Sequence, residues 1–284
     1  MRRIAHISDL HFSWVDRAVV DGLLAELNGD RPDLVIASGD FTQGARRAEF
    51  VEAQGFLGRL ESPVLCVPGN HDITPYHLIQ RFFDPYRRYR HYIHPEIEPV
   101  WRDDEIAVIG VNTARRFAFE LNWSYGRINA RQLRRVRDLL SSLPEHLFRI
   151  VVGHHPFLPP DEAPETRVVG GAEEALACFH SQGVGLVLAG HLHRGYARSL
   201  RPVVEDGAVT GAVEKAPQAS RARRMTVVQA GSATSTRLRN QEPNAYNRIT
   251  IEGAEARIEA RLWTGRRFES AREPGVEAEA RAAG

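Results

Sequence analysis

The chain has 284 residues, of which 43% are hydrophobic and 26% are charged, and its formal net charge is +1. This size and composition predict a soluble globular protein with a substantial core. A net charge near zero creates no field that would favour nucleic acid or an acidic membrane surface. We therefore expect no specific nucleic-acid binding and no membrane association.

The two cysteines, Cys66 and Cys178, lie outside any CxxC pattern. They are expected to be reduced, buried thiols of a cytosolic protein. No apolar run approaches the roughly 18 residues that span a bilayer. The first predicted strand begins near Arg3, which leaves no room for a cleavable signal. The cytoplasm is therefore the expected compartment.

Apolar runs alternate with amphipathic stretches through the first two thirds of the chain. The runs are rich in Val, Ile and Leu and predict buried strands at Arg3–Ser8, Leu34–Ser38, Val64–Val67, Ile106–Val111, Phe148–Val152 and Leu186–Ala189. The stretches between them predict helices at Asp16–Leu27, Ala45–Leu60, Tyr76–Tyr89, Ala130–Leu140 and Gly171–His180. Pro85 is expected to interrupt its helix, and Asn129 is the expected N-cap of the one that follows it. This alternation is typical of an α/β protein.

The last third of the chain has a different pattern. Met225–Ala230, Tyr246–Ile251 and Ala256–Trp263 predict consecutive strands, the last one antiparallel, so that the sheet is mixed or there are two sheets. The weakly patterned segment Arg201–Arg224 predicts a loop or a loose hairpin. We expect a single domain over residues 1–270 and a flexible tail over residues 271–284.

Five short polar segments each follow a predicted strand: Asp9-Leu10-His11, Gly39-Asp40, Gly69-Asn70-His71-Asp72, Gly153-His154-His155 and Gly190-His191-Leu192-His193. In α/β sheets, functional groups gather beyond the carboxyl ends of strands. In extended backbone, alternate residues such as Asp9 and His11 share one side and could bind one ion.

Each segment has a simpler explanation when it is taken alone. A lone Asp-x-His or Gly-Asp is more often a turn or a helix cap. A cap does not explain why His71 stands between an amide and a carboxylate. Histidine is the commonest ligand of transition metals, and mixed sets of His, Asp and Asn suit Zn, Mn or Fe. Together the five segments predict a site for two metal ions.

The ordered series of segments resembles the calcineurin-like metallophosphoesterase superfamily, and the stretch from Ala230 to Asn247 also resembles its members. The resemblance implies a four-layer αββα sandwich of two mixed β-sheets flanked by helices. It also implies a dinuclear site at the strand ends, with two transition metal ions such as Mn, Fe or Zn.

The resemblance further implies a role for each residue of the series. The metal ligands would be Asp9, His11 and His193 for one ion, Asn70, His154 and His191 for the other, and Asp40 between them. His71 would be the catalytic histidine, and Asp72 would orient it or its loop. The implied reaction is phosphoester hydrolysis by in-line attack of a metal-bridging hydroxide, in which His71 contacts the phosphoryl oxygen or protonates the leaving group.

The sequence after Asp40 narrows the expected substrate. Gly39-Asp40-Phe41-Thr42 is similar to the small bacterial cyclic-nucleotide phosphodiesterase group and lacks the Asp-Arg-Gly continuation of the protein phosphatases. We therefore expect hydrolysis of a small-molecule phosphodiester, with 3′,5′-cyclic nucleotides as candidates. His155, Arg115 and Arg116 are candidate substrate contacts.

Other functions remain open at this stage. A phosphomonoesterase, a glycerophosphodiesterase and a lipid-linked pyrophosphatase would use the same fold and the same ligands. A non-enzymatic scaffold is disfavoured because His71 and all seven ligand positions are present. The pattern does not predict an oligomeric state.

Overall fold

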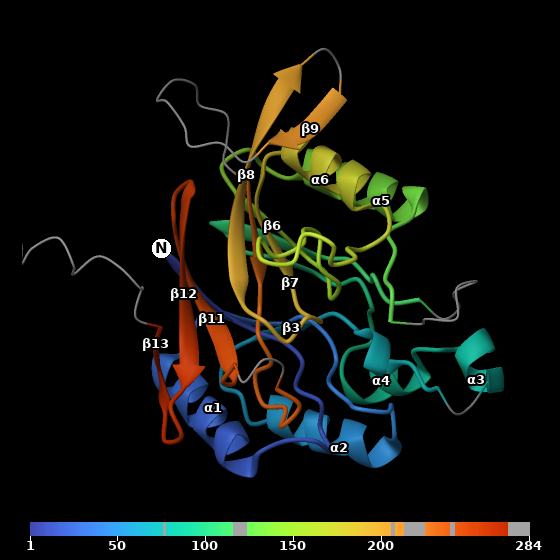
Figure 1. Ribbon diagram of the computed structural model, residues 1–284, viewed down its shortest axis with the longest axis vertical. Coiled ribbons are helices and arrows are strands. Elements are labelled where there is room, and N and C mark those ends of the chain that lie inside the picture. The colour runs from blue at the N-terminus through green and yellow to red at the C-terminus, as the bar shows by residue number, and fades with distance from the viewer. Residues whose placement is uncertain (76–77, 116–123, 206–207, 213–224, 239–241, 272–284) are drawn as a thin grey trace, which may run out of the picture.

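The computed structural model describes residues 1–75, 78–115, 124–205, 208–212, 225–238 and 242–271. Its strands form two mixed sheets that pack face to face, with helices on the outer faces (Figure 1). The predicted α/β fold with two mixed sheets is therefore confirmed.

The first sheet has six strands in the order β13-β12-β11-β1-β2-β3. The strands β1, β2 and β3 are parallel, and β11, β12 and β13 add antiparallel neighbours. Their bounds are Arg2–Ile7 for β1, Leu34–Ala37 for β2, Val64–Cys66 for β3, Ala245–Glu252 for β11, Glu255–Trp263 for β12 and Phe268–Ser270 for β13.

The second sheet has seven strands in the order β4-β5-β6-β7-β10-β8-β9. Its centre, from β5 to β10, is parallel, and both edges are antiparallel. The bounds are Val100–Arg102 for β4, Ile106–Gly110 for β5, Phe148–Val152 for β6, Val184–Ala189 for β7, Tyr196–Glu205 for β8, Ala208–Ala212 for β9 and Met225–Gln229 for β10.

Alternation along the strands assigns side chains to separate layers, because successive residues of a strand point to opposite faces. In β1, Ile4 packs between the two sheets, whereas Ala5 and Ile7 pack on the other face against helices. In β5, Val108 packs between the sheets and Ile109 packs outward. This two-sided burial is the reason that the strand sequences are almost wholly apolar.

The helices cover the two outer faces of the sandwich (Figure 1). The bounds are Arg17–Asp30 for α1, Arg47–Leu57 for α2, Leu78–Phe83 for α3, Arg87–Tyr92 for α4, Ala130–Ser142 for α5 and Ala172–Ser181 for α6. Helices α1 and α2 pack on the first sheet, and α5 and α6 pack on the second. The layer order is therefore αββα, as the sequence predicted.

Most predicted elements are confirmed, with ends shifted by a few residues. The Asn129 side chain accepts hydrogen bonds from the backbone N–H of Arg131 and Gln132, so it is the N-cap of α5. The predicted helix Tyr76–Tyr89 is divided at Pro85 into α3 and α4. Cys66 and Cys178 are both free and buried.

The three-residue edge strands β4 and β13 were not foreseen, because they are too short to show an alternating pattern. The hairpin β8–β9 agrees with one of the alternatives for Arg201–Arg224, a loop or a loose hairpin, but its first strand begins earlier, at Tyr196. Residues 213–224 and the predicted tail after Ala271 lie outside the described residues. The single domain over residues 1–270 stays a prediction.

Among the helices that the structure describes, none is both long enough and apolar enough to span a bilayer.

Candidate metal centre

The polar segments after the strands meet at one edge of the sandwich. Backbone hydrogen bonds join them: Asp9 N–H donates to the Gly39 carbonyl at 3.1 Å, and Gly190 N–H donates to the His154 carbonyl at 2.8 Å. Because the strands of each sheet are parallel here, their carboxyl ends deliver these loops side by side.

One group of side chains consists of Asp9, His11 and His193, whose possible ligand atoms all lie within 4.8 Å of one another. His193 Nε2 is 3.4 Å from Asp9 Oδ1 and 3.1 Å from His11 Nε2. All three side chains are buried. This group can hold one metal ion.

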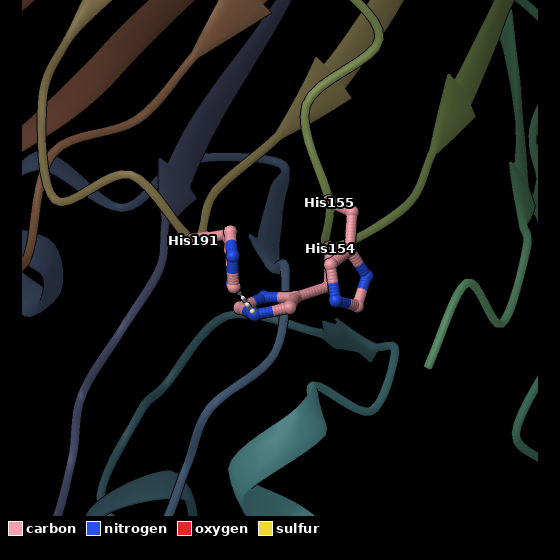
Figure 2. Close-up of side chains that lie close together, drawn as sticks. All are labelled: His154, His155 and His191. Atoms are coloured by element: carbon pink, nitrogen blue, oxygen red, sulfur yellow. Dashed lines mark hydrogen bonds between the residues drawn. The ribbon is translucent and has the colours of Figure 1, made fainter. Parts of the chain in front are cut away.

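A second group surrounds His154 Nε2. This nitrogen lies 3.2 Å from Asp40 Oδ2, 3.2 Å from Asn70 Oδ1 and 3.3 Å from His191 Nδ1. Figure 2 shows His154 and His191 in contact, with His155 beside them. Asp40 Oδ2 also lies 3.7 Å from His11 Nε2, so Asp40 stands between the two groups.

The hydrogen bonds of the histidines show which nitrogens face the centre as acceptors. His154 Nδ1 lies 2.7 Å from the Ser38 carbonyl, and His193 Nδ1 lies 3.2 Å from the Arg237 carbonyl. A carbonyl only accepts, so each Nδ1 carries a proton, and Nε2 is the nitrogen that can offer a lone pair to a cation at the centre. Asp9 Oδ1 is buried there without a hydrogen-bond partner among the residues that the structure describes. Several acceptors aimed at one another fit a bound cation.

The electrostatics of the centre favour positive charge. Burial by itself lowers the pKa of His154, but the carboxylates of Asp40 and Asp9 raise it to about 9. Burial by itself raises the pKa of Asp40, yet the neighbouring histidines, His154 first, hold it well below its usual value. The donor set therefore suits a pair of divalent metal ions, with Asp40 placed between them.

The backbone at these positions is left-handed rather than extended. Positive φ angles occur at Asp9 (53°), His11 (50°), Asp40 (55°), His191 (80°) and His193 (56°). The expectation that Asp9 and His11 could bind one ion agrees with their common group, but the expected extended backbone was wrong. His191 and His193 turn to different groups. The left-handed backbone conformation raises the free energy of a non-glycine residue by about 1 kcal/mol or more, so contacts with surrounding residues must stabilise it.

Glycines allow the segments to approach one another. A Cβ at Gly69 would collide with the carboxylate of Asp40, and a Cβ at Gly190 would collide with the hydroxyl of Ser8. Glycine at positions 69 and 190 is thus a requirement of close packing.

His71 and Asp72 belong to a short loop held by hydrogen bonds. His71 N–H donates to Asp40 Oδ1 at 2.9 Å, and its Nδ1 donates to the Gln43 carbonyl at 2.6 Å. Asp72 accepts from the N–H of Gly69 at 2.9 Å and of Thr42 at 3.0 Å. Burial, together with the charge of Asp40, raises the pKa of Asp72 to about 7.

Thr42 is a residue that sequence reasoning noted only as part of a motif. Its hydroxyl donates to the His71 carbonyl at 2.9 Å, and its N–H donates to Asp72. Thr42 therefore ties the loop of His71 to the strand end that carries Asp40. The signal that could have identified Thr42 in the sequence was its position two residues after Asp40.

His155 is fully engaged within the protein. Its Nε2 donates to the Ser124 carbonyl at 2.9 Å, so its Nδ1 accepts from the Thr113 hydroxyl at 2.7 Å. Thr113 in turn accepts from the N–H of His154 and His155 at 3.3 and 3.2 Å. Sequence reasoning missed Thr113, because it stands in no recognised motif. A substrate contact by His155 stays a prediction.

Of the two arginines predicted to contact substrate, the structure describes only Arg115. Arg115 lies beyond the end of β5 and is half-buried, and Arg116 lies outside the described residues.

The stretch after β10 supports the first loop. The Ser232 hydroxyl donates to the Asp9 carbonyl and the Thr234 hydroxyl to the Leu10 carbonyl, both at 2.8 Å. Asn244 Nδ2 donates to the Ser235 carbonyl at 2.9 Å. These contacts hold Asp9 in its left-handed conformation.

A fold of this kind with such a centre is that of a metallophosphoesterase. The family model for calcineurin-like phosphoesterases matches residues 2–195, which include all five segments. The chain belongs to this family, and the family together with its His/Asp groups supports a hydrolase of phosphoesters that uses two divalent metal ions.

Two curated proteins are similar over part of their length. Glycerophosphodiester phosphodiesterase GpdQ of Enterobacter lignolyticus is 40% identical over 80 residues, which are 24% of this chain and 29% of that protein. The probable glycerophosphodiester phosphodiesterase GpdQ of Arcobacter nitrofigilis is 26% identical over 167 residues, 58% of each chain. The matches thus span less than two thirds of either relative.

The fold is also similar to a solved structure. Purple acid phosphatase PPD1 from yellow lupin, Lupinus luteus, superposes with a TM-score of 0.67 at 11% identity, over 95% of this chain and 52% of that one. At this identity the likeness concerns the fold alone.

Proposed function

We propose that this protein is a metal-dependent phosphodiesterase acting on small-molecule diesters. The observation that carries the proposal is the convergence of two acceptor groups on either side of Asp40. Asp9, His11 and His193 would hold one ion. Asn70, His154 and His191 would hold the other, and Asp40 would touch both.

Each predicted role has a structural basis. When bound, two metal ions neutralise the phosphoryl oxygens and lower the pKa of water towards roughly 7. His71 is fixed by Gln43 through Nδ1, so Nε2 is the atom that can exchange a proton with a substrate. Asp72 positions the loop by accepting from Gly69 and Thr42. We propose manganese, iron or zinc, because the donors are mainly imidazole and carboxylate.

Two substrate classes are favoured by different observations. Glycerophosphodiesters are favoured by the printed names of the two curated relatives. Cyclic 3′,5′-nucleotides are favoured by the Gly39-Asp40-Phe41-Thr42 motif, whose Thr42 holds the His71 loop. Both are small anionic diesters, so the reaction class is the same.

The test is a comparison of substrates with purified protein supplied with Mn²⁺. The substrates are bis(p-nitrophenyl) phosphate, p-nitrophenyl phosphate, glycerophosphocholine and 3′,5′-cyclic AMP. We expect turnover of the diesters to exceed that of the monoester, and the Asp40→Asn variant to be inactive. Turnover of the monoester alone would reassign the protein as a phosphomonoesterase, and no turnover of any compound would refute the proposal.

A further inference from the structure

A cavity of about 800 Å³ lies beyond the end of β5, beside the candidate metal centre. Asn112 and Ala114 both line this cavity, and the residue between them is Thr113, which holds His155. Successive Cα atoms are about 3.8 Å apart, so the cavity wall begins one residue from a direct neighbour of the centre. The segment Asn112–Ala114 therefore links the cavity to the centre.

The charge of this cavity is strongly positive. Four arginines line it, namely Arg90, Arg115, Arg127 and Arg131. Asp84 is the one acidic side chain among the described lining residues, and it pairs with Arg90 at 2.7 Å. The chain as a whole has a net charge of only +1, so the positive charge is concentrated here rather than general.

The other three arginines form no ion pair with any residue in the described part of the chain. Like charges that face one hollow repel one another, and a bound anion relieves that repulsion. The planar guanidinium group matches a phosphate through two parallel hydrogen bonds. The cavity therefore has the charge, the donor geometry and the volume to accept a phosphate group.

We propose that this arginine cavity binds a second phosphate carried by the substrate, so that the protein selects diesters that also bear a terminal phosphate. The inference rests on the proposed phosphodiesterase activity, since the diester itself would lie at the metal centre. Arg115, Arg127 and Arg131 act as specificity-determining residues. A simple diester without the second phosphate leaves the cavity unused.

The test compares two dinucleotides that differ by one group: ApA, and pApA with its additional 5′-phosphate. With Mn²⁺-supplied protein we expect kcat/KM to be about 10-fold higher for pApA, since partly exposed charge pairs are individually weak. In the double variant Arg127→Gln/Arg131→Gln this preference should fall to about one, with the turnover of bis(p-nitrophenyl) phosphate unchanged. The matched control is Arg134→Gln. Arg134 is an exposed arginine of α5, the helix that carries Arg131, and it is not among the residues that line the cavity.

A binding measurement separates this inference from the proposed function. The affinities of pApA and ApA are measured by calorimetry with the His71→Gln variant, which is expected to keep its metal while turnover is slowed. Tighter binding of pApA that is lost in Arg127→Gln/Arg131→Gln supports the cavity even if the protein hydrolyses no diester. Equal affinities and equal kcat/KM values for the two dinucleotides would overturn it, even if bis(p-nitrophenyl) phosphate is hydrolysed.

Discussion

The candidate metal centre has two halves that differ in burial. Asp9 and His11 are each 0% exposed and His193 is 6% exposed, whereas in the other group His154 is 0% exposed but Asn70 and His191 are half-buried. Acceptors in the buried half lack water and must be satisfied by the protein or by an ion. In the other half, a substrate can reach the partly exposed side chains of Asn70 and His191. We infer that one half mainly retains its ion and the other mainly meets the substrate.

The position of His71 fits this division. It is half-buried, and its ring stands edge-on to that of His11 at 4.9 Å between centroids. It therefore lies where the enclosed half meets the accessible one.

The largest effect is expected from Asp40→Asn, because Asp40 stands between the halves and its loss weakens both. We expect kcat/KM to fall by about 10³-fold or more, since charge stabilisation by metals contributes several kcal/mol. Bound metal, measured by plasma mass spectrometry, should fall with it. Asp138→Asn, an exposed change on α5, is the control. An unchanged metal content would contradict the assignment of Asp40 as a shared ligand.

His71→Gln is expected to separate chemistry from metal binding. Loss of a proton-transfer group lowers kcat by roughly 10²–10⁴-fold. The metal content should stay at the wild-type level, because no ligand is removed. His146→Gln, at an exposed position, should leave kcat unchanged. If metal content fell together with kcat, His71 would have to be reassigned as a ligand.

Thr113→Val tests whether the hydrogen bonds of Thr113 to the His154–His155 segment are needed for activity. The change removes the hydroxyl that donates to His155 Nδ1 and accepts from two backbone N–H groups. We expect kcat/KM to fall about 10-fold, the scale of effects from residues behind metal ligands. Thr264→Val, in the turn after β12, provides the comparison. Equal activity in both variants would show that the His154–His155 segment does not depend on Thr113.

His6, a buried residue near the buried half of the centre, should contribute to the dependence of folding stability on pH in acid. His6 lies beneath it, with Nε2 2.9 Å from the Ser38 hydroxyl, and burial lowers the pKa of His6 to about 3. The unfolded value is near 6.5, so the unfolded chain binds the proton first. The stability contributed by neutral His6 is complete above pH 6.5. It is lost at about 1.4 kcal/mol per pH unit as the pH falls towards 3.

Urea unfolding of metal-free protein between pH 7.5 and 4.5 measures this slope. The His6→Gln variant should show a shallower dependence than the wild type, because its side chain does not titrate. If the unfolding free energies of the two proteins changed with pH in parallel, His6 would not be the source of this pH dependence.

The helices and strands could largely be predicted because their signals are local. Asn129 caps its helix through contacts two and three residues away, and Pro85 divides a helix by its own geometry. The apolar runs of β1 and β5 indicate strands that are buried on both faces. By contrast, β4 and β13 exist through pairing with a neighbouring strand, and a three-residue segment carries no period of its own.

The segments that meet at the centre could also be predicted, since each of them follows an apolar strand. Its supporting residues could not. Thr113, Ser38 and Gln43 act through a hydroxyl or a carbonyl, and such groups occur in every part of a chain. Only folding shows which of them faces a histidine.

The sequence by itself thus determined the α/β class, the positions of most strands and the polar segments that follow them, because these signals are local. The αββα layers were implied by the family resemblance. The tertiary structure decided how those residues converge. Left-handed backbone at His191 and His193 accompanies side chains that turn to different groups, although Asp9 and His11, also left-handed, stay in one group. It also brought Arg115, Arg127 and Arg131 around one cavity. Neither result has a local signal, since both depend on contacts between distant segments.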